Sequence, residues 1–343
     1  MNSSPLLLSG FPATDLTGKS ILITGGTGSF GQQFVETVVT RYQPRRLAIY
    51  SRDEFKQYEM SQRFSDRDHP CLRYFIGDIR DCERLEMALR GVEIVIHAAA
   101  LKHVPAAEYN PFECINTNVL GAENLVRASI RAGVKRVVAL STDKAASPIN
   151  LYGASKLAAD KIFVAANNLG APTGTYFSVV RYGNVIGSRG SVVPFFRRLV
   201  AEGAERLPIT DSRMTRFWIT LQQGVDFVLS SLAMMRGGEI FVPKIPSTKV
   251  TDIARLLAPG LPHEIVGIRP GEKLHESMIT ESDARMTLDL GDRYCIEPGF
   301  ITWMRKSFRE DGMCAVDEDF FYSSDSNDQW LDDAALADLL RSV

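Results

Sequence analysis

The first half of this 343-residue chain alternates short runs of β-branched and aliphatic residues with amphipathic segments of helical length. No other feature restricts the possible folds as strongly. Strands that are separated by helical segments are joined by crossover connections, so they lie parallel in one sheet. A parallel sheet has to be covered by helices on both faces. The chain is therefore predicted to form an α/β fold with a doubly wound parallel sheet.

Both kinds of segment can be placed along the chain. The expected strands are Ser20–Thr24, Leu47–Ser51, Arg73–Asp78, Ile94–Ala98, Val137–Ser141 and Tyr176–Tyr182. The expected helices are Phe30–Thr40, Glu54–Arg63, Cys82–Arg90, Ile115–Ala132 and Tyr152–Asn168, with a terminal helix in the acidic segment Asp328–Leu340. In such sheets ligands bind beyond the carboxyl ends of the strands, so polar motifs at those ends are the candidates for function.

Composition excludes several classes of protein. The 39 Lys and Arg against 41 Asp and Glu residues give a net charge of −2 without a basic run, so we expect no nucleic-acid partner and no polybasic membrane anchor. The five cysteines include no CxxC pair, which indicates a reducing compartment and no disulfide framework. No apolar run approaches the roughly 18 residues of a spanning helix, and no basic signal region is present. We expect a cytoplasmic enzyme or binding protein that does not contact membranes.

A glycine-rich turn follows the first expected strand directly, so that residues 21–31 have the order strand, turn and helix start. Glycine at positions 25 and 28 lets the backbone approach a pyrophosphate, whose charge the free amides of the helix N-terminus hold. Glycine at position 31 lets that helix pack against the strand. A purely structural tight turn has the same local pattern. The combination predicts dinucleotide binding through Gly25, Thr27, Gly28, Ser29, Phe30 and Gly31.

The end of the second strand bears on which dinucleotide is bound. Folds of this type place an acidic residue there for the ribose hydroxyls, whereas an arginine accepts a 2′-phosphate. Here the strand is followed by Arg52 and Asp53, and the arginine favours NADP, although it could simply pair with a surface carboxylate. The adjacent Asp53 argues in the other direction. The expected cofactor contacts in this part of the chain are Ser51, Arg52, Asp53, Lys56, Asp78, Ile79, Ala98 and Ala99.

A second motif places Tyr152 and Lys156 four residues apart, after the expected strand that leads into Thr142, Asp143 and Lys144. On a helix the tyrosine and lysine side chains lie on one face. A cation there, together with an oxidised nicotinamide, is expected to lower the phenol pKa from its reference near 10. Tyr152 could then take a hydroxyl proton as hydride leaves the same carbon, which is alcohol oxidation. The spacing alone is also common in surface pairs.

Together these segments resemble the extended short-chain dehydrogenase/reductase family and, within it, the inverting UDP-N-acetylglucosamine 4,6-dehydratases that open pseudaminic acid biosynthesis. The resemblance extends from about Ser20 to Leu331 and is weakest over residues 280–317. It is carried by Ala98–Pro105, Ser141–Ala145, Arg181–Pro194, Met214–Trp218, Gly267–Leu274, Tyr322–Ser324 and Gln329–Leu331. It implies a Rossmann-like fold, for which we predict an N-terminal extension (1–19), an NADP-binding domain (20–191) and a mainly substrate-binding region (192–343) interleaved with the last strands.

The resemblance implies a reaction in which hydride leaves C4 of the sugar, water is lost across C5 and C6, hydride returns at C6, and C5 is reprotonated from the opposite face. Tyr152 is then the C4 base, Lys156 lowers its pKa and binds the nicotinamide ribose, and Thr142 hydrogen-bonds the C4 oxygen. Lys144 is assigned as the C5 base and Asp143 as the acid for the C6 hydroxyl. An amine is a base only when neutral, so Lys144 needs a pKa well below about 10.4. Burial favours such a shift and Asp143 opposes it.

For UDP-N-acetylglucosamine the resemblance implies a site rich in basic and loop residues. Guanidinium groups make paired hydrogen bonds with a diphosphate, although a single arginine is more often an exposed charge. The expected residues are Lys102, also expected at the cofactor, and Asn184, Val185, Gly187, Ser188, Arg189, Val193, Thr210, Arg216 and Arg269. No metal is expected, because His97 and His103 have no carboxylate or cysteine at ligand spacing. His97 is assigned to a packed strand, and Phe195, Phe196 and Trp218 to the core.

Other functions stay open at this point. A retaining UDP-sugar dehydratase or a C4 epimerase would share the fold, and the epimerase would need Tyr152 but not the Asp143–Lys144 pair. A non-catalytic NADP-binding regulator would need no intact Tyr152–Lys156 pair. The resemblance also implies a homo-oligomer of dimer units joined through Ile115–Ala132 and Tyr152–Asn168, with hexamers among the nearest relatives.

Overall fold

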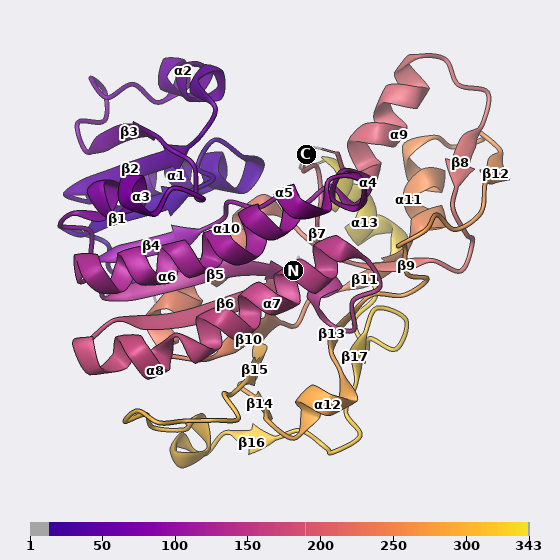
Figure 1. The fold of residues 1–343 in the computed structure, drawn as a ribbon. Helices are drawn as coiled ribbons and strands as arrows, with labels where there is room; N and C mark the ends of the chain where they lie inside the picture. The colour runs from indigo at the N-terminus through magenta and orange to yellow at the C-terminus, as the bar shows by residue number, and fades with distance from the viewer. Residues whose placement is uncertain (1–13, 189, 342–343) are drawn as a thin grey trace.

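The computed structural model describes residues 14–188 and 190–341, and a ten-stranded sheet runs through this part of the chain (Figure 1). The strands of this sheet are β1 (Ser20–Thr24), β2 (Arg46–Ser51), β3 (Leu72–Ile76), β4 (Ile94–His97), β5 (Arg136–Thr142), β6 (Tyr176–Tyr182), β10 (Ile240–Pro243), β14 (Thr287–Asp289), β15 (Arg293–Ile296) and β16 (Cys314–Ala315). Their order in space is β16-β14-β15-β10-β6-β5-β4-β1-β2-β3. The strands from β3 to β10 pair in parallel, and β15, β14 and β16 pair antiparallel. The predicted doubly wound parallel sheet is confirmed.

Helices cover the sheet on both faces. They are α1 (Ser29–Arg41), α2 (Glu54–Arg63), α3 (Cys82–Leu89), α4 (Val104–Tyr109), α5 (Pro111–Ile115), α6 (Gly121–Ala132), α7 (Leu151–Ala165), α8 (Asn167–Gly170), α9 (Val192–Ala201), α10 (Leu221–Met234), α11 (Val250–Leu257), α12 (Glu281–Ala284) and α13 (Asp333–Arg341). α3, α6 and α7 pack side by side on one face, and α1 packs with α10 on the other (Figure 1). No helix within residues 14–188 and 190–341 is long and apolar enough to cross a membrane.

Local sequence explains where many elements begin and end. All five residues of β1 are buried, as expected for a strand in the middle of a covered sheet. Asp53 and Asn150 cap α2 and α7, because their side chains accept hydrogen bonds from backbone N–H groups in the first turn. Gly133 ends α6 in the left-handed conformation, with φ 72°, that glycine adopts without strain.

The predicted strands and helices of the first half are confirmed with small shifts at their ends, but two of the expected helices are divided. The expected helix Tyr152–Asn168 ends at Ala165 in α7, and α8 begins at Asn167. Residues 115–132 were expected to form one helix, and the structure divides this stretch into the end of α5, a π-helical turn η1 (Asn116–Leu120) and α6. Within η1 the buried side chain of Asn118 accepts a hydrogen bond from the backbone N–H of Leu101 and donates one to its carbonyl. The turn therefore holds the loop that follows β4. The terminal helix begins at Asp333. The residue before it, Asp332, accepts a hydrogen bond from the N–H of Ala335 in the first turn.

Residues after β6 contribute to the main sheet and also form a smaller lobe. The remaining strands are β7 (Asn184–Val185), β8 (Leu207–Ile209), β9 (Thr215–Ile219), β11 (Ser247–Lys249), β12 (His263–Ile265), β13 (Ser277–Ile279) and β17 (Tyr322–Ser323), with 3-10 turns η2 (Asp143–Ala145), η3 (Ala171–Thr173) and η4 (Phe308–Asp311). A second apolar core contains Phe196 and Trp218, as expected. Phe195 was expected in the core, but its side chain faces solvent beside Arg198. The boundary between the predicted regions, near residue 191, stays a prediction.

Candidate active site

The glycine turn lies between the end of β1 and the start of α1. Gly25 has φ +65°, and a Cβ atom there would lie 2.8 Å from the backbone nitrogen of Ala99. A Cβ atom at Gly31 would lie 2.3 Å from the carbonyl oxygen of Gly26, so the helix packs on the turn only because position 31 lacks a side chain. Gly28 is the cap residue of α1 and offers no side chain that would bond the first amides. The turn therefore has no Cβ atom at positions 25, 28 and 31, the feature that lets a backbone bind a pyrophosphate closely.

Two residues of opposite charge, Arg52 and Asp53, follow the end of β2, and each has its own partners. Asp53 caps α2 with a hydrogen bond of 3.0 Å from the N–H of Lys56, and its carboxylate also lies 3.0 Å from Lys56 Nζ. The Arg52 side chain is 61% exposed, and its guanidinium lies 4.0 Å from the carboxylate of Asp78, at the limit of an ion pair. The acidic residue is therefore engaged by its own helix, while the guanidinium of Arg52 extends beside the strand end.

The other residues expected at the cofactor lie near the same end of the sheet. Thr27, Ser51 and Ile79 are buried, and Ala98 and Ala99 are partly buried in the loop that approaches the glycine turn. His97 is buried in β4, where Nδ1 lies 2.7 Å from the hydroxyl of Thr24 in β1. Its assignment to a packed strand is confirmed.

The end of β5 carries a buried polar group. The Thr142 hydroxyl donates a hydrogen bond of 2.8 Å to Oδ1 of Asp143, and Lys144 Nζ donates one of 3.1 Å to the same oxygen. Asp143 is fully buried, and its second oxygen, Oδ2, has no hydrogen-bond partner. The expectation for Thr142 was a hydrogen bond to substrate, and within the protein its hydroxyl is directed to Asp143.

A carboxylate that the sequence analysis did not single out completes this group. Glu276 Oε1 lies 3.2 Å from Lys144 Nζ and 3.8 Å from Nε of Arg216, and the residue is only 2% exposed. Its Oε2 is buried without a partner, as Oδ2 of Asp143 is. We call Asp143, Lys144, Arg216 and Glu276 the strand-end cluster. The available signal for Glu276 was its position two residues after the segment Gly267–Leu274, which carries the family resemblance.

The sequence analysis left the charge of Lys144 open: a C5 base has to be neutral, but burial could not be ranked against Asp143. Burial does work against the charge, but the ion pairs with Asp143 and Glu276 outweigh it and raise the pKa of Lys144 above its usual value. Lys144 is therefore an ammonium ion in this arrangement, because two carboxylates face it rather than one.

Tyr152 and Lys156 lie on α7, on the side that faces β5. Burial raises the pKa of the Tyr152 phenol to about 12, and the opposing influences are the charge of Lys144 and a hydrogen bond with Thr142. Lys156 Nζ donates a hydrogen bond of 2.6 Å to the carbonyl of Leu140, and burial lowers its pKa. Among the cations, Lys144 is the one that lowers the phenol pKa in this arrangement. The role expected for Lys156 stays a prediction.

The residues expected at the substrate are only partly brought together. Oδ1 of Asn184, on β7, lies 3.5 Å from Lys144 Nζ, so Asn184 adjoins the strand-end cluster that contains Arg216. Arg269 lies in the loop before β13, exposed and 3.4 Å from Glu272. Val193 is fully buried in the second core, and its expected contact with substrate stays a prediction. Arg189 lies outside the described residues, and Lys102, Val185, Gly187, Ser188 and Thr210 occupy loops or the short strand β7.

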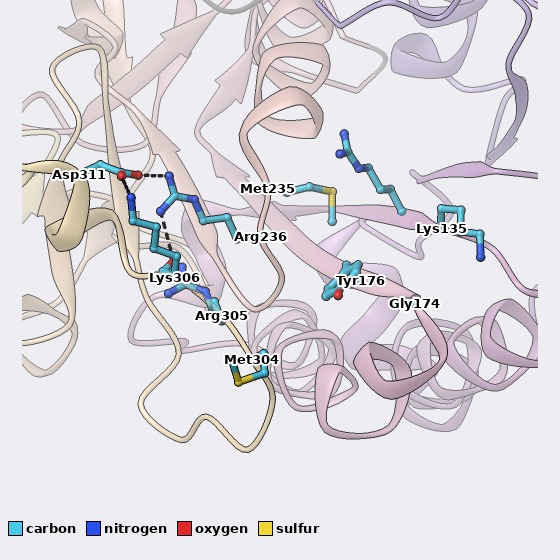
Figure 2. A pocket seen from close by; sticks show the side chains of 10 residues that line it. Lys135, Gly174, Tyr176, Met235, Arg236, Met304, Arg305, Lys306 and Asp311 are labelled. Atoms are coloured by element: carbon cyan, nitrogen blue, oxygen red, sulfur yellow. Dashed lines mark hydrogen bonds and ion pairs between the residues drawn. The ribbon is translucent and has the colours of Figure 1, made fainter.

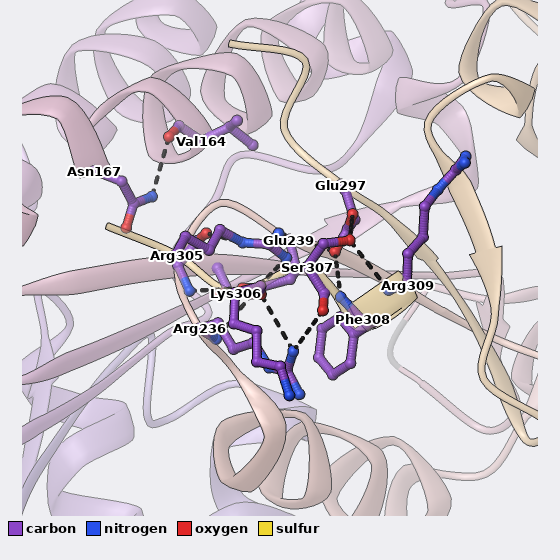
Figure 3. Close-up of polar contacts among 12 residues, drawn as sticks. Val164, Asn167, Arg236, Glu239, Glu297, Arg305, Lys306, Ser307, Phe308 and Arg309 are labelled. Carbon is purple, nitrogen blue, oxygen red and sulfur yellow. Dashed lines mark hydrogen bonds and ion pairs between the residues drawn. The ribbon is translucent and has the colours of Figure 1, made fainter. Parts of the chain in front are cut away.

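A second buried ion group lies at the opposite end of the sheet, where β10 begins. Arg305 donates to Oε1 of Glu239 at 3.0 Å and to Oε1 of Glu297 at 2.9 Å (Figure 3). Backbone N–H groups and the hydroxyls of Ser178 and Ser307 bond the carboxylate oxygens further, so neither glutamate has an unpartnered oxygen. We call Arg305, Glu239 and Glu297 the sheet-base cluster.

A cavity of about 620 Å³ opens beside the sheet-base cluster (Figure 2). Its lining includes Lys135 and Arg136 at the start of β5, and also Arg236 and Lys306, which both pair with Asp311. Because parallel strands present their carboxyl ends at the other edge, this cavity lies away from the strand-end cluster. Within the described residues no group of three His, Cys, Asp or Glu side chains is placed to hold a metal ion.

Comparison with known proteins places the chain among sugar-modifying enzymes. Residues 21–298 match the model of a family described as polysaccharide biosynthesis protein. The chain is 56% identical over 330 residues to the UDP-N-acetylglucosamine 4,6-dehydratase (inverting) of Campylobacter jejuni, with 94% of this chain and 98% of the relative covered. It is 43% identical to the UDP-glucose 4-epimerase of Rickettsia canadensis, with 81% and 82% covered.

Two solved structures resemble the fold. The X-ray structure of Pen from Bacillus thuringiensis has a TM-score of 0.86 and 33% sequence identity, and the match covers 95% of this chain and 98% of that one. The dTDP-glucose 4,6-dehydratase DesIV of Streptomyces venezuelae, solved with NAD and TYD bound, has a TM-score of 0.66 and 26% identity, with 74% and 86% covered. The likeness to Pen extends over nearly the full length of both chains.

Proposed function

This chain belongs to the polysaccharide biosynthesis protein family of short-chain dehydrogenase/reductase enzymes, and we propose that it is a UDP-N-acetylglucosamine 4,6-dehydratase that inverts C5 and uses NADP. One observation carries the proposal. The buried Asp143 and the partly buried Lys144 form an ion pair at the end of β5 that acts on the Tyr152 phenol. Tyr152 alone is sufficient for C4 oxidation, whereas loss of water across C5 and C6 needs a further acid and base.

The residues fit a nicotinamide dinucleotide. The glycine turn provides space and free amides for the pyrophosphate, and Ala98 and Ala99 leave room beside it. Arg52 supports NADP over NAD, because its guanidinium extends from the end of β2 while Asp53 is engaged by Lys56 and the start of α2. When bound, the cofactor supplies the hydride acceptor for C4 and the hydride donor for C6.

Tyr152 accepts the C4 hydroxyl proton in this proposal. Because burial raises the phenol pKa to about 12, the phenolate needs a nearby positive charge, and Lys144 as an ammonium ion supplies it. Thr142 also lowers the phenol pKa, although its hydroxyl proton is donated to Asp143 before substrate binds. Lys156 is then left to position the cofactor ribose and to hold α7 against the carbonyl of Leu140.

The elimination step needs Lys144 in its other protonation state. Nζ of Lys144 and Oδ1 of Asp143 are 3.1 Å apart, so one proton can pass from the ammonium to the carboxylate and leave an amine beside a carboxylic acid. The amine then takes the C5 proton, and Asp143 gives its proton to the C6 hydroxyl, which leaves as water. Proton count and charge therefore balance within the pair for the loss of water. When hydride returns at C6, C5 takes a proton from solvent on the opposite face, and Tyr152 releases the C4 hydroxyl proton to solvent, so the whole cycle balances.

Recognition of the nucleotide sugar falls to the smaller lobe. Arg216 belongs to the strand-end cluster and Asn184 adjoins it, and Arg269 is the exposed guanidinium for the diphosphate. The product is an unusual keto sugar for surface glycans of the pseudaminic acid type.

We also propose a homo-oligomer, because Tyr109 and Phe112 are 86% and 81% exposed beside α6 and α7.

Incubation with UDP-N-acetylglucosamine and NADP in deuterated water tests the function. We expect a 6-deoxy-4-keto product that carries deuterium at C5 with inverted configuration, read by NMR. Deuterium at C5 with retained configuration would identify a retaining dehydratase. A C4 epimer that keeps its C6 hydroxyl and C5 hydrogen would identify an epimerase, the activity named for the Rickettsia relative. NADP binding without any product would indicate a regulator.

A further inference from the structure

The backbone at Glu276 is held firmly at the edge of the smaller lobe. Its N–H donates a hydrogen bond of 3.0 Å to the Ser324 hydroxyl, and its carbonyl accepts one of 2.8 Å from the Ser324 N–H. The residue immediately precedes β13, which pairs with β17. These contacts fix Glu276 in a part of the chain far from β5 in sequence and direct its side chain to the end of that strand.

The two oxygens of the Glu276 carboxylate differ in their contacts. Oε1 faces both Lys144 and Arg216, at 3.2 Å and 3.8 Å. The terminal nitrogens of Arg216 donate to the backbone carbonyls of Thr215, Lys273 and Leu274, so Lys144 is the closer and less committed partner of the carboxylate. Oε2 is buried without a partner. A carboxylate that only held the fold together would have both oxygens bonded, as buried polar groups generally do.

We propose that Glu276 is a positioning residue for proton transfer at C5, and that its carboxylate holds Nζ of Lys144 opposite Asp143 and sets the charge that the amine carries. The inference rests on the proposed function, in which Lys144 has to be charged while C4 is oxidised and neutral while C5 loses its proton. Between two carboxylates at 3.1 Å and 3.2 Å, Nζ is held in place and its ammonium form is favoured.

Other charged groups act on Lys144 from the surrounding elements. Arg216, on β9, and Lys102, in the loop after β4, repel its charge. Lys273, before β13, carries a further positive charge near the same carboxylates, and its Nζ donates to the carbonyl of Ala146. Tyr152 adds a negative charge only when its phenol is ionised. Three cations therefore favour the neutral amine, and Asp143 with Glu276 oppose them.

Glu276→Gln removes one of these two opposing charges and keeps the shape of the side chain. An opposite charge within 4–6 Å raises or lowers a pKa by about 1–3 units. Removal of the carboxylate charge therefore lowers the pKa of Lys144, and the neutral amine is present at lower pH. The rate of C5 proton transfer should rise with pH as the neutral amine forms. We expect the midpoint of that rise to lie at least about one pH unit lower in Glu276→Gln than in the wild type.

The experiment isolates that step from hydride transfer. The purified protein with bound NADP is given the 6-deoxy-4-keto product in deuterated water, and exchange of its C5 hydrogen is followed by NMR across pH. Glu276→Asp keeps the charge and should restore the wild-type midpoint. Glu297→Gln is the matched control, because Glu297 is also a buried glutamate paired with an arginine, at the other end of the sheet. Its midpoint should equal that of the wild type.

An unchanged midpoint in Glu276→Gln would overturn the inference, and so would slower exchange at every pH without a shift, which is the result expected if Glu276 itself accepts the proton. A second measurement does not depend on turnover. With 13C-labelled lysine, the Lys144 signal, assigned by its absence in Lys144→Ala, should show a more neutral amine in Glu276→Gln than in the wild type at pH near 10. If the wild type forms no keto sugar, the proposed function fails. The Lys144 signal would still show whether Glu276 sets the charge of Lys144.

Discussion

The strand-end cluster and the sheet-base cluster contain the same kinds of side chain but differ in how completely they are satisfied. Arg305 lies between Glu239 and Glu297, and every carboxylate oxygen there has a partner (Figure 3). Lys144 lies between Asp143 and Glu276 in a similar way. Among residues 14–188 and 190–341, the carboxylate oxygens buried without a partner are Oδ2 of Asp143 and Oε2 of Glu276.

The difference separates a structural ion group from one arranged for chemistry. A buried charge that is fully hydrogen-bonded fixes the packing around it, and removal of one partner leaves an uncompensated charge. Buried oxygens without partners weaken the fold unless another molecule or a proton uses them. The first arrangement should therefore govern stability, and the second should govern activity. Two substitutions test this division, in addition to the variants of Glu276, and two more concern groups outside both clusters.

The largest effect is expected from Lys144→Ala. Removal of the C5 base should slow formation of the keto sugar by about 10²–10⁴-fold, the usual contribution of a general acid or base. NADP binding should persist, because Lys144 is not part of the glycine turn. Product formation is measured by NMR and NADP affinity by fluorescence titration. Turnover within tenfold of the wild type would remove Lys144 from the mechanism.

Arg305→Ala should have the opposite effect: it should lower stability and leave turnover unchanged. Loss of the guanidinium leaves Glu239 and Glu297 buried without their cation, and about 3–5 kcal/mol of unfolding free energy should be lost. The turnover of the molecules that remain folded should be unchanged at low temperature. Urea unfolding measures the first quantity and an active-site-normalised assay the second. A selective loss of turnover with wild-type stability would reverse the roles of the two clusters.

A smaller effect is expected at the cofactor, beyond both clusters. Arg52→Ala should weaken NADP binding relative to NAD by about 10–100-fold, since a hydrogen bond to a charged group contributes roughly 1.5–3 kcal/mol. The affinity for NAD should change little. Titration of both dinucleotides against wild type and variant gives the ratio. Equal losses for the two cofactors would mean that Arg52 acts through Asp78 and not through a 2′-phosphate.

A last effect, which appears only below pH 6.5, involves His97, which is buried in β4 without an ion pair. Burial is the main cause that lowers its pKa to about 3, from a usual value of 6.5. The unfolded chain therefore binds a proton that the folded state excludes. Stability from this residue is complete above pH 6.5 and falls by about 1.4 kcal/mol per pH unit as pH decreases toward 3. His97→Asn should reduce this slope in urea midpoints measured between these pH values, whereas an unchanged slope would assign it to other groups.

Much of the fold follows from local pattern. The strand and helix segments up to β6 appear where hydrophobic pattern places them, because the central strands are short apolar runs buried on both faces and the helices bury one apolar stripe. The π turn at Asn118 is different. Its form accompanies hydrogen bonds to Leu101, in a loop that precedes it by two short helices, so no local periodicity indicates it.

In the candidate site, too, some features follow from the sequence and others do not. The residues of the glycine turn, together with Thr142, Asp143, Lys144 and Tyr152, lie in motifs whose spacing follows from a strand end and a helix face, and the sequence alone was enough to select them as candidates. Their roles stay predictions. The charge state of Lys144 could not be selected, since it depends on how many carboxylates face one amine.

The amino-acid sequence by itself determined the doubly wound sheet and the polar residues at its strand ends, because both depend on interactions between residues that are close along the chain. Only the tertiary structure decided that Glu276 from the smaller lobe reaches Lys144 and that Lys144 carries a charge. Electrostatic energy depends on distances of a few ångströms between groups and on their burial, and neither quantity exists until distant segments have packed together.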